Sequence, residues 1–273
     1  MPADVRSLLR FRGGSAPALR IPPDATPGIA KREARQQLAD DEERLRGLQE
    51  RLFAEGKRAL LVVIQGMDTS GKDAVVKHVF GAMDPQGVRV TAFKKPTDEE
   101  LRHDFLWRIR RALPHAGQVG IFNRSHYEDV LVVRVHGLVP RRVWARRYAT
   151  INAFEREISR SGTTIVKVFL YLSFEEQRKR LLDRLRTPDK RWKFNPNDLA
   201  ERALWPAYME AYADALAKCS SPAAPWYVIP SDHEWYRDWA IGRILVATLE
   251  RMRPRYPRPR LDIRGLEARL RTG

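Results

Sequence analysis

Cysteine is almost absent from this sequence of 273 residues, in which Cys219 is the single example. A lone cysteine cannot form a disulfide within the chain or build a cysteine-rich metal site, and this favours a reducing compartment. Long apolar runs are absent too, because none reaches the ~18 residues that a membrane-spanning helix requires. The opening residues, MPADVRSLLRFRGG, lack the apolar core of a secretory signal. We therefore expect a soluble, cytoplasmic protein.

Acidic residues are few relative to basic ones. The chain has 50 Lys and Arg against 34 Asp and Glu, which gives a net charge of +16 and a pI near 10.4. An excess of this size attracts polyanions, and nucleic acid, an anionic membrane or a polyphosphate chain would all satisfy it. The hydrophobic content of 43% indicates a globular chain, with room for one large domain or two small ones.

Short apolar runs alternate with helical patterns along most of the chain. Such runs are typical of strands that are buried on both faces of a parallel sheet. The predicted strands are residues 59–66, 88–95, 117–124, 163–172 and 225–232. The predicted helices are residues 31–56, a stretch from 72, and 98–112, 140–160, 173–186, 197–218 and 234–253. This alternation predicts one doubly wound α/β sheet, in which ligands bind beyond the carboxyl ends of the strands.

The two ends of the chain differ in composition from this middle part. Residues 1–27 are mixed, with glycine and proline pairs, and we expect an extended arm. Residues 28–253 form the predicted domain, with a lid at about 178–197. Residues 254–273 are basic and rich in proline near their start, and we expect a second extended tail.

A phosphate-binding loop is predicted directly after the first strand. The segment GMDTSGKD, residues 66–73, matches G-x-x-x-x-G-K between a buried strand and a helix. Its backbone N–H groups would cradle phosphate oxygens at a helix N-terminus, with Lys72 holding the terminal phosphates. The loop residues predicted to bind phosphate or nucleotide are Gly66, Met67, Thr69, Ser70, Gly71 and Asp73.

Two acids in this loop depart from the usual pattern. A typical loop of this kind has Ser or Thr after the lysine to bind Mg²⁺, but this chain has Asp73. A carboxylate beside a phosphate is unfavourable unless a cation lies between them. We therefore predict that Asp68 is a Mg²⁺ ligand. Asp73 is either a second one or simply a favourable charge in the first helical turn.

The third predicted strand ends in FNRSHYED, which supplies a second group of candidates. Asn123 stands where many related enzymes have a metal-binding acid, as a neutral ligand or a water-orienting amide. Arg124 is predicted to stabilise phosphoryl charge in the transition state, although a plain surface arginine is the alternative. Glu128 is also predicted to take part in binding phosphate or nucleotide. For His126 we expect a structural hydrogen bond rather than a catalytic base.

A basic run follows the fourth strand. Between residues 178 and 193 there are eight Lys and Arg against two Asp, a local charge of +6. A closing lid there would bring cations to the transferred group, whereas a solvated helix face is the alternative. Arg178, as a catalytic residue, and Arg186, as a phosphate-binding one, are the preferred candidates, and we expect Lys190 and Lys193 to bind phosphate outside the reacting centre. Lys94 and Lys95, at the carboxyl end of the second strand, bind acceptor phosphate or lie on the rim.

Taken together, five segments closely resemble the family-2 polyphosphate kinases. They are GMDTSGKD, FKKPTDEELRHDFLWR, FNRSHYEDVLVVRVHG, DKRWKFNPNDL and APWYVIPSDHEWYR, and the resemblance spans about residues 30–253. It implies an α/β P-loop kinase fold of the thymidylate-kinase type, with three layers, a five-stranded parallel sheet and a helical lid. It also implies Mg²⁺, inorganic polyphosphate and nucleotides as cofactor and substrates, and a homo-oligomer, either a dimer or a tetramer.

Carried over residue by residue, the resemblance assigns metal and phosphate contacts to Asp68 and Lys72 and a second motif to Asn123 and Arg124. Asn123, which many members replace by Asp, resembles the class III branch that accepts both nucleoside mono- and diphosphates. Asn123 is accordingly the second predicted metal ligand.

Two rival functions use parts of the same pattern. An ATP-dependent nucleotide or nucleoside kinase would share nearly all of these features. A basic nucleic-acid-binding protein is supported by charge alone, because the sequence has no recognised nucleic-acid motif. We therefore expect neither nucleic acid nor a membrane as a partner.

Overall fold

The structure, a computed structural model, describes residues 4–13 and 21–272. Its centre is a five-stranded parallel sheet in the order β2-β3-β1-β4-β5. The strands are β1 (Ala59–Gly66), β2 (Val88–Ala92), β3 (Val119–Asn123), β4 (Thr163–Tyr171) and β5 (Trp226–Pro230). The predicted α/β class and all five predicted strands are confirmed, and β2, β3 and β5 are shorter than the sequence indicates.

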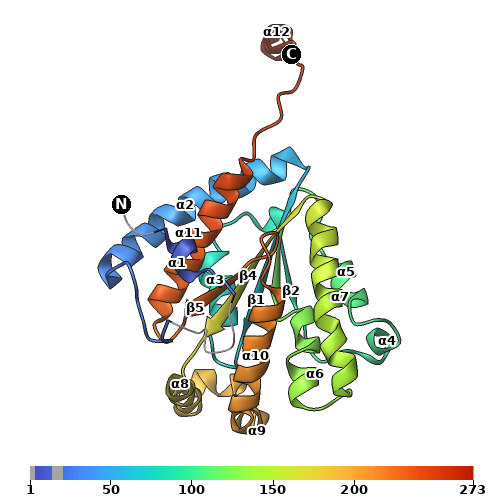
Figure 1. Ribbon diagram of the computed structural model, residues 1–273. Coiled ribbons are helices and arrows are strands. Elements are labelled where there is room, and N and C mark those ends of the chain that lie inside the picture. Colours follow the sequence, from blue (N-terminus) through green and yellow to red (C-terminus); the bar gives the residue numbers. More distant parts are fainter. Residues whose placement is uncertain (1–3, 14–20, 273) are drawn as a thin grey trace.

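The central strand β1 explains why the sheet is buried on both faces. All eight of its residues are buried, so the apolar run has no polar side to turn toward water. Leu60, Val62 and Ile64 pack into one core cluster, while Leu61 and Val63 pack into the other. The alternation places β1 between two layers of helices, as Figure 1 shows.

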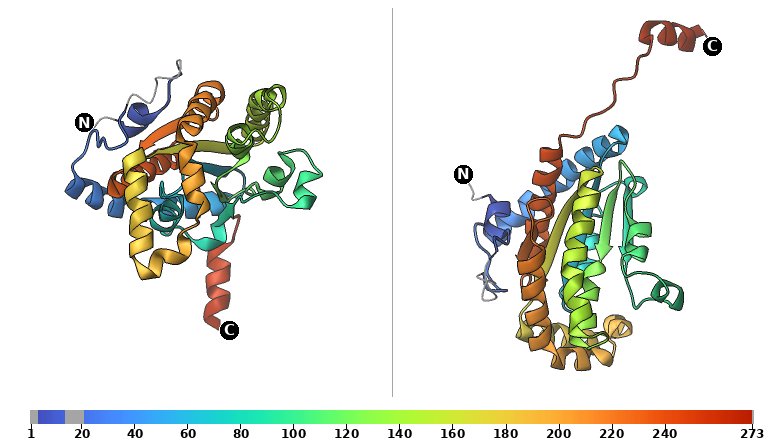
Figure 2. Two further views of the ribbon diagram at one scale, coloured as in Figure 1. Left: turned by 90° about the horizontal axis from the view of Figure 1, so that it is seen from below. Right: turned by 45° about the vertical axis from the view of Figure 1, so that its right-hand side comes forward.

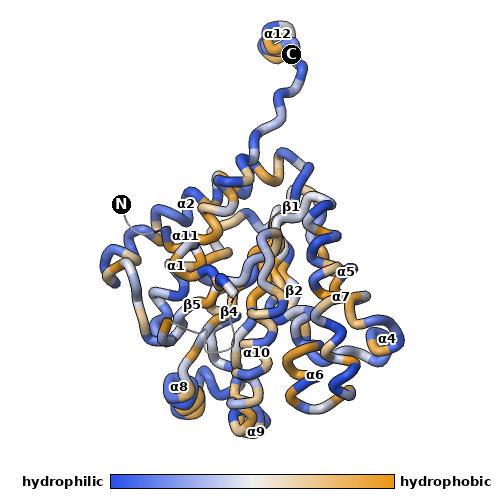
Figure 3. Tube along the Cα trace, in the orientation of Figure 1, coloured by the Kyte–Doolittle hydropathy of each residue, from blue (hydrophilic) through white to orange (hydrophobic). Residues whose placement is uncertain are grey.

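Helices cover each face of the sheet and make the fold three layers thick (Figures 1 and 2). One layer contains α1 (Val5–Leu9), α2 (Lys31–Glu55), α3 (Lys72–Val79) and α11 (Glu234–Met252). The other contains α5 (Trp107–Ala112), α6 (Val132–Val135), α7 (Arg141–Arg160) and α10 (Trp205–Cys219). Hydrophobic residues gather along the strands in Figure 3. None of the described helices combines the length and apolar character needed to cross a bilayer.

The remaining elements connect these layers or lie beyond them. They are η1 (Pro85–Gly87), α4 (Asp98–Leu101), η2 (His126–Asp129), α8 (Phe174–Arg186), η3 (Pro188–Lys193), α9 (Asn197–Ala203) and α12 (Ile263–Thr272). Elements α8, η3 and α9 follow β4 in the region of the predicted lid. They lie beyond the carboxyl ends of the strands, at the bottom of Figure 1.

Two predicted helices are each divided in the structure. The segment 98–112 forms α4 and α5, because the Asp104 side chain accepts a hydrogen bond from the Leu106 N–H at 2.9 Å and opens a new turn. The segment 197–218 forms α9 and α10, because Pro206 lies in the first turn of α10 and has no N–H to continue the preceding helix.

The described part of the N-terminal arm is more ordered than its composition suggests. It contains α1, whose Val5 and Leu9 are buried. The Phe11 N–H then donates to the Trp226 carbonyl at 2.9 Å, so the arm covers the edge strand β5. Residues 1–3 and 14–20 of the predicted arm lie outside the described residues.

The basic tail leaves α11 and projects from the body (Figure 2). Its first part is extended as expected, but it ends in α12, which the prediction did not include.

Candidate active site

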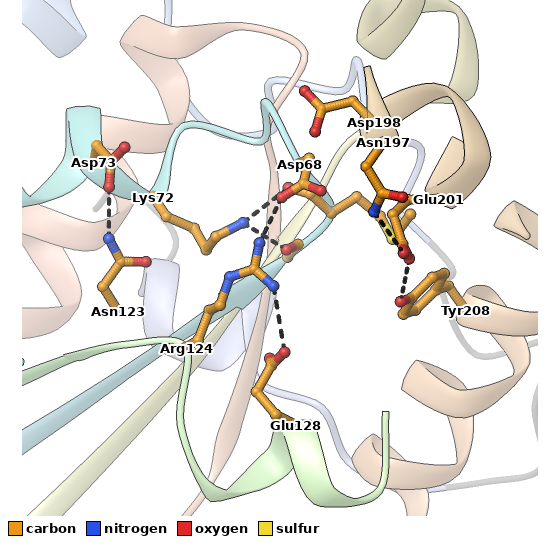
Figure 4. A network of polar contacts seen from close by, with 12 residues as sticks. Asp68, Lys72, Asp73, Asn123, Arg124, Glu128, Asn197, Asp198, Glu201 and Tyr208 are labelled. Atoms are coloured by element: carbon orange, nitrogen blue, oxygen red, sulfur yellow. Dashed lines mark hydrogen bonds and ion pairs between the residues drawn. The ribbon is translucent and has the colours of Figure 1, made fainter. Parts of the chain in front are cut away.

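The loop between β1 and α3 has the backbone of an anion-binding site. Thr69 and Gly71 both adopt positive φ angles, of 66° and 97°, and no side chain caps the N-terminus of α3. The Lys72 ammonium group folds back over the loop and donates to the carbonyls of Gly66 and Met67, at 2.8 and 3.0 Å (Figure 4). The predicted strand, loop and helix are therefore present, with Lys72 at the loop.

Lys72 is electrostatically unusual because its side chain is buried. Burial, reinforced by the positive charge of Arg124, lowers the pKa of Lys72 to about 8, although Asp68, Glu128 and Asp73 oppose the shift. An anion bound at the loop would stabilise the charged form of Lys72 and raise its pKa again. The protonated lysine and a bound anion therefore stabilise each other.

Two hydroxyl groups of the loop have no partner of their own. Among the described residues, Thr69 Oγ1 and Ser70 Oγ are buried without a hydrogen bond. Buried polar groups are normally satisfied, so both hydroxyls are suited to a bound ligand. Phosphate oxygens would accept from each of them, as from the N–H groups at the start of α3.

The end of β3 brings Asn123 and Arg124 beside this loop. Asn123 pairs in register with Ile64 of β1, and the Arg124 N–H donates to the Ile64 carbonyl at 3.0 Å. Arg124 then adopts a positive φ of 63°, an uncommon conformation for a residue other than glycine. Strain at such a position is often found where function fixes a side chain.

That conformation directs the Arg124 guanidinium between two carboxylates (Figure 4). Its Nη2 donates to Asp68 Oδ1 at 2.7 Å, and its Nη1 donates to Glu128 Oε2 at 3.4 Å. Burial lowers the pKa of Arg124, but Glu128 and Asp68 outweigh burial and raise it above its ordinary value. The charge is therefore permanent, and the predicted residues Asp68, Arg124 and Glu128 form one cluster.

Asn123 joins the second acid of the loop. Its Nδ2 donates to Asp73 Oδ1 at 2.6 Å, which ties the first turn of α3 to the end of β3. Asp73 thus has a neutral partner in the protein, whereas Asp68 has a cationic one.

The helices after β4 add a group of residues that the sequence analysis did not single out. On α8, Gln177 Nε2 donates to the Asp68 carbonyl at 3.2 Å, and Arg180 Nη1 donates to the Thr69 carbonyl at 3.0 Å. Arg180 Nη2 also donates to the Ser231 carbonyl, at the end of β5, at 2.7 Å. The helical repeat could have identified the side of α8 that faces the loop, because residues three apart, such as Gln177 and Arg180, lie on the same side of a helix.

The basic residues that were predicted in this region lie elsewhere. Arg178 pairs with Glu175 at 2.7 Å and Lys190 with Asp183 at 2.7 Å, both on exposed side chains. Lys193 stacks over the ring of Trp192. Arg186, Lys94 and Lys95 are exposed as well. Within the described residues, no hydrogen bond or ion pair joins any of these six to the loop, so their roles remain predictions.

Acids from α9 face the loop from the far side of the site (Figure 4). Burial and the nearby charge of Asp68 raise the pKa of the Asp198 carboxyl. Next to it, Glu201 accepts a hydrogen bond from the Tyr208 hydroxyl at 2.6 Å. Carboxylates that repel each other in this way favour a cation between them.

His126 has the structural role expected of it. It is buried, and its Nε2 lies 3.3 Å from Glu155 Oε1. Glu155 also pairs with Lys167 at 2.6 Å and accepts from the Tyr127 hydroxyl at 2.8 Å. This buried network includes His126 and Tyr127 of η2, the segment that also carries Glu128.

The site as a whole can bind and neutralise phosphate groups. Lys72 and Arg124 carry positive charge, the loop carries hydrogen-bond donors, and Asp68 and Asp73 carry carboxylate oxygens of the kind that a hard cation prefers. Because phosphoryl transfer depends on positioning and electrostatic stabilisation, the cluster is suited to that chemistry.

Comparison with known proteins gives one consistent family. The family model described as Polyphosphate kinase 2 (PPK2) matches residues 28–257. An AMP/ADP-polyphosphate phosphotransferase of Meiothermus ruber is 50% identical over 88% of this chain and 91% of the relative. An ADP-polyphosphate phosphotransferase of Rhodopseudomonas palustris is 42% identical over 84% and 83%. The crystal structure of polyphosphate kinase 2 from Arthrobacter aurescens matches with a TM-score of 0.96 and 46% identity, covering 100% of this chain and 98% of that one.

Proposed function

The chain belongs to the polyphosphate kinase 2 family and is a phosphotransferase; from this premise we propose that it moves phosphoryl groups between inorganic polyphosphate and nucleoside mono- or diphosphates. AMP and ADP would be converted to ADP and ATP, and the reaction would be reversible. The observation that carries the proposal is one loop that holds the buried Lys72 and two buried hydroxyls without a partner among the described residues, with Arg124 reaching it from the neighbouring strand.

In the proposed mechanism, the loop and Lys72 grip the phosphate chain. Thr69 and Ser70 hydroxyls and the N–H groups of α3 bind its oxygens, and protonated Lys72 balances their charge. Arg124 stabilises negative charge on the phosphoryl group as it passes in line to the acceptor. No strong base is needed, because the acceptor is itself a phosphate oxygen, and this agrees with the structural role of His126.

The residues present are compatible with Mg²⁺. The described residues hold no group of three or more His, Cys, Asp or Glu that could bind a metal by itself. Mg²⁺ is usually held by only one or two carboxylates together with water and substrate phosphates, and Asp68 meets that requirement. Asp68 would hold the ion, with Asn123 nearby as a second ligand or through water. When bound, the ion would neutralise phosphate charge, which would also relieve the repulsion between Asp68 and Asp198.

Asn123 supports an acceptor range that includes both mono- and diphosphates. In its place an aspartate would add a charge beside Asp73, at the same edge of the loop. A neutral amide leaves less repulsion against anionic acceptors of different length. The Meiothermus ruber relative carries both AMP and ADP in its name, which is consistent with this range.

An assay of donors and acceptors tests the proposal. The purified protein is mixed with Mg²⁺, long-chain polyphosphate and AMP, ADP, GMP or GDP in turn, and products are separated by chromatography. ADP and ATP formed from AMP would support both donor and acceptor range. Activity on diphosphates alone would overturn the interpretation of Asn123. Transfer from ATP but not from polyphosphate would identify the rival nucleotide kinase.

Three further expectations belong to the same proposal. We infer a homo-oligomer, a cytoplasmic location and no nucleic-acid partner. Sedimentation of the purified protein tests the first. Weak DNA binding that does not change with salt concentration, beside strong kinase turnover, supports the last.

A further inference from the structure

The carbonyl groups of the phosphate loop are held from outside by three side chains. Gln177 donates to the Asp68 carbonyl at 3.2 Å, Arg180 to the Thr69 carbonyl at 3.0 Å, and Arg237 to the Ser70 carbonyl at 3.4 Å. These are three successive residues of the loop. We call Gln177, Arg180 and Arg237 the carbonyl clamp.

The geometry of the peptide bond links the direction of each held carbonyl to that of the next N–H group. In a planar trans peptide the C=O and the following N–H point in opposite directions. A carbonyl that is drawn outward therefore turns the next N–H inward. The clamp on the Asp68 and Ser70 carbonyls therefore directs the N–H groups of Thr69 and Gly71 away from the clamp residues, to the opposite side of the loop.

Arg237 is the member of the clamp that is most tightly built in. It is fully buried on α11, its Nε donates to Asp238 Oδ1 at 2.8 Å, and its Nη2 has no partner. A Cβ atom on Gly71 would lie only 1.9 Å from Arg237 Nη1. The glycine and the guanidinium therefore fit each other, and any side chain at position 71 would displace the clamp.

Arg237 and its neighbour Asp238 also hold α3, the helix that follows the loop. Asp238 Oδ2 lies 3.1 Å from His78 Nδ1 on α3. Asp238 balances the charge of Arg237 at close range, so the contribution of Arg237 to the loop is one of shape more than of net charge. Burial of a guanidinium with an unsatisfied donor lowers the stability of the folded protein. An apolar side chain of similar size would not carry this penalty.

We propose that Gln177, Arg180 and Arg237 are positioning residues that pre-shape the loop for phosphate. Two of the three belong to α8, at the start of the predicted lid. The position of α8 and the affinity of the loop for phosphate are therefore coupled. The inference rests on the proposed function, because it assumes that the loop binds a phosphate chain.

Binding of tripolyphosphate, measured by titration calorimetry, tests the clamp apart from turnover. Gln177→Met, Arg180→Lys and Arg237→Lys each remove or shorten one donor while keeping size or charge. We expect each to weaken tripolyphosphate binding about tenfold, the effect of one lost hydrogen bond to a buried group. In turnover, the KM for polyphosphate should rise more than kcat falls.

Two variants serve as matched controls. Lys179→Met removes an exposed lysine of α8 that pairs with Glu176, and Arg243→Met removes an arginine of α11 that pairs with Asp41. Neither contacts the loop in the described structure, so tripolyphosphate affinity should stay at the wild-type level. Thermal unfolding of every variant separates lost affinity from lost fold.

A rescue experiment keeps the proposal falsifiable if one substitution disturbs the core. Millimolar guanidinium, but not urea, should restore tripolyphosphate binding to Arg237→Ala, because only the cation can both donate to the Ser70 carbonyl and pair with the buried carboxylate of Asp238. Wild-type affinity in folded clamp variants would overturn the inference and leave the proposed function intact. If the wild-type protein bound no tripolyphosphate, the proposed function itself would fail.

Discussion

Arg124 Nη2 donates a hydrogen bond of 2.7 Å to Asp68 Oδ1, and this contact joins the end of β3 to the phosphate loop. The two side chains are partly exposed, at 38% and 29%. A cation and a carboxylate that face the same open space can each turn to a ligand, Arg124 to phosphate oxygens and Asp68 to a metal ion. The pair therefore keeps both side chains at the site, where each can exchange its partner for a ligand.

The first prediction follows from this contact. Asp68→Ala and Arg124→Ala should each lower turnover roughly 10²-fold or more, because both groups stabilise the same transferring charge. The double variant should lose less than the product of the two single losses, since residues that act as a unit are not additive. Values of kcat/KM for the wild type, the two single variants and the double variant complete the double-mutant cycle. Losses that multiply fully would show that the two act independently.

The second prediction concerns pH. The folded-state pKa of Lys72 is lowered to about 8, so the lysine loses its charge as the pH rises through that value. Tripolyphosphate binding should therefore weaken above pH 8, with uptake of a proton on binding. Ionisation of the terminal phosphate over the same range would strengthen binding, so the sign of the trend distinguishes the lysine from the ligand.

Titration calorimetry at several pH values, in buffers of different ionisation enthalpy, measures both effects. Lys72→Arg supplies the control, because arginine stays charged throughout. An affinity that varies from pH 7 to 9 in the same way for the wild type and for Lys72→Arg would contradict the buried, neutralisable lysine.

The third prediction uses the contact between Asn123 and Asp73. Asn123→Asp would set two carboxylates 2.6 Å apart, where like charges repel. Without divalent ions the variant should melt at a lower temperature than the wild type. Added Mg²⁺ should raise its melting temperature more than that of the wild type. Thermal unfolding with and without Mg²⁺ decides, and equal Mg²⁺ responses would argue against a cation site at this edge.

The fourth prediction concerns stability behind the site. Lys167→Met should cost roughly 3–5 kcal/mol, because it leaves Glu155 charged and buried without its partner. Adding Glu155→Gln should recover most of that loss, since the amide still accepts from Tyr127. Arg110→Met, which breaks the exposed pair with Glu157, should cost no more than ~1 kcal/mol. Denaturant unfolding of the wild type and these three variants measures the differences, and a double variant as unstable as Lys167→Met would refute the role of the buried ion pair.

The sequence predicts the sheet and the loop well because their signals are local. The run ALLVVIQG is buried along its whole length, and the Gly71-Lys72 pair follows it after only four residues. Asn123 and Arg124 could be placed because parallel strands end at one edge. Each of these inferences depends on residues that are near one another in the chain.

The rest of the site depends on contacts that no short pattern contains. Arg237 reaches Ser70 across 167 residues of sequence, and nothing near Arg237 indicates a loop contact. On α8 the basic run drew attention to Arg178, whereas the helical phase set by buried Gln177 brings Arg180 to the loop. Charge alone could not distinguish two arginines that lie on different sides of one helix.

Transfer of labelled phosphate tests the central claim most directly. Polyphosphate labelled with ³²P is incubated with AMP, Mg²⁺ and either the wild-type protein or a folded Lys72→Ala variant. We predict that label appears in ADP and ATP with the wild type, at a rate roughly 10²-fold or more above that of the variant. Label that never reaches the nucleotide, or that reaches it equally fast with both proteins, would contradict the assignment of this loop as the site of phosphoryl transfer.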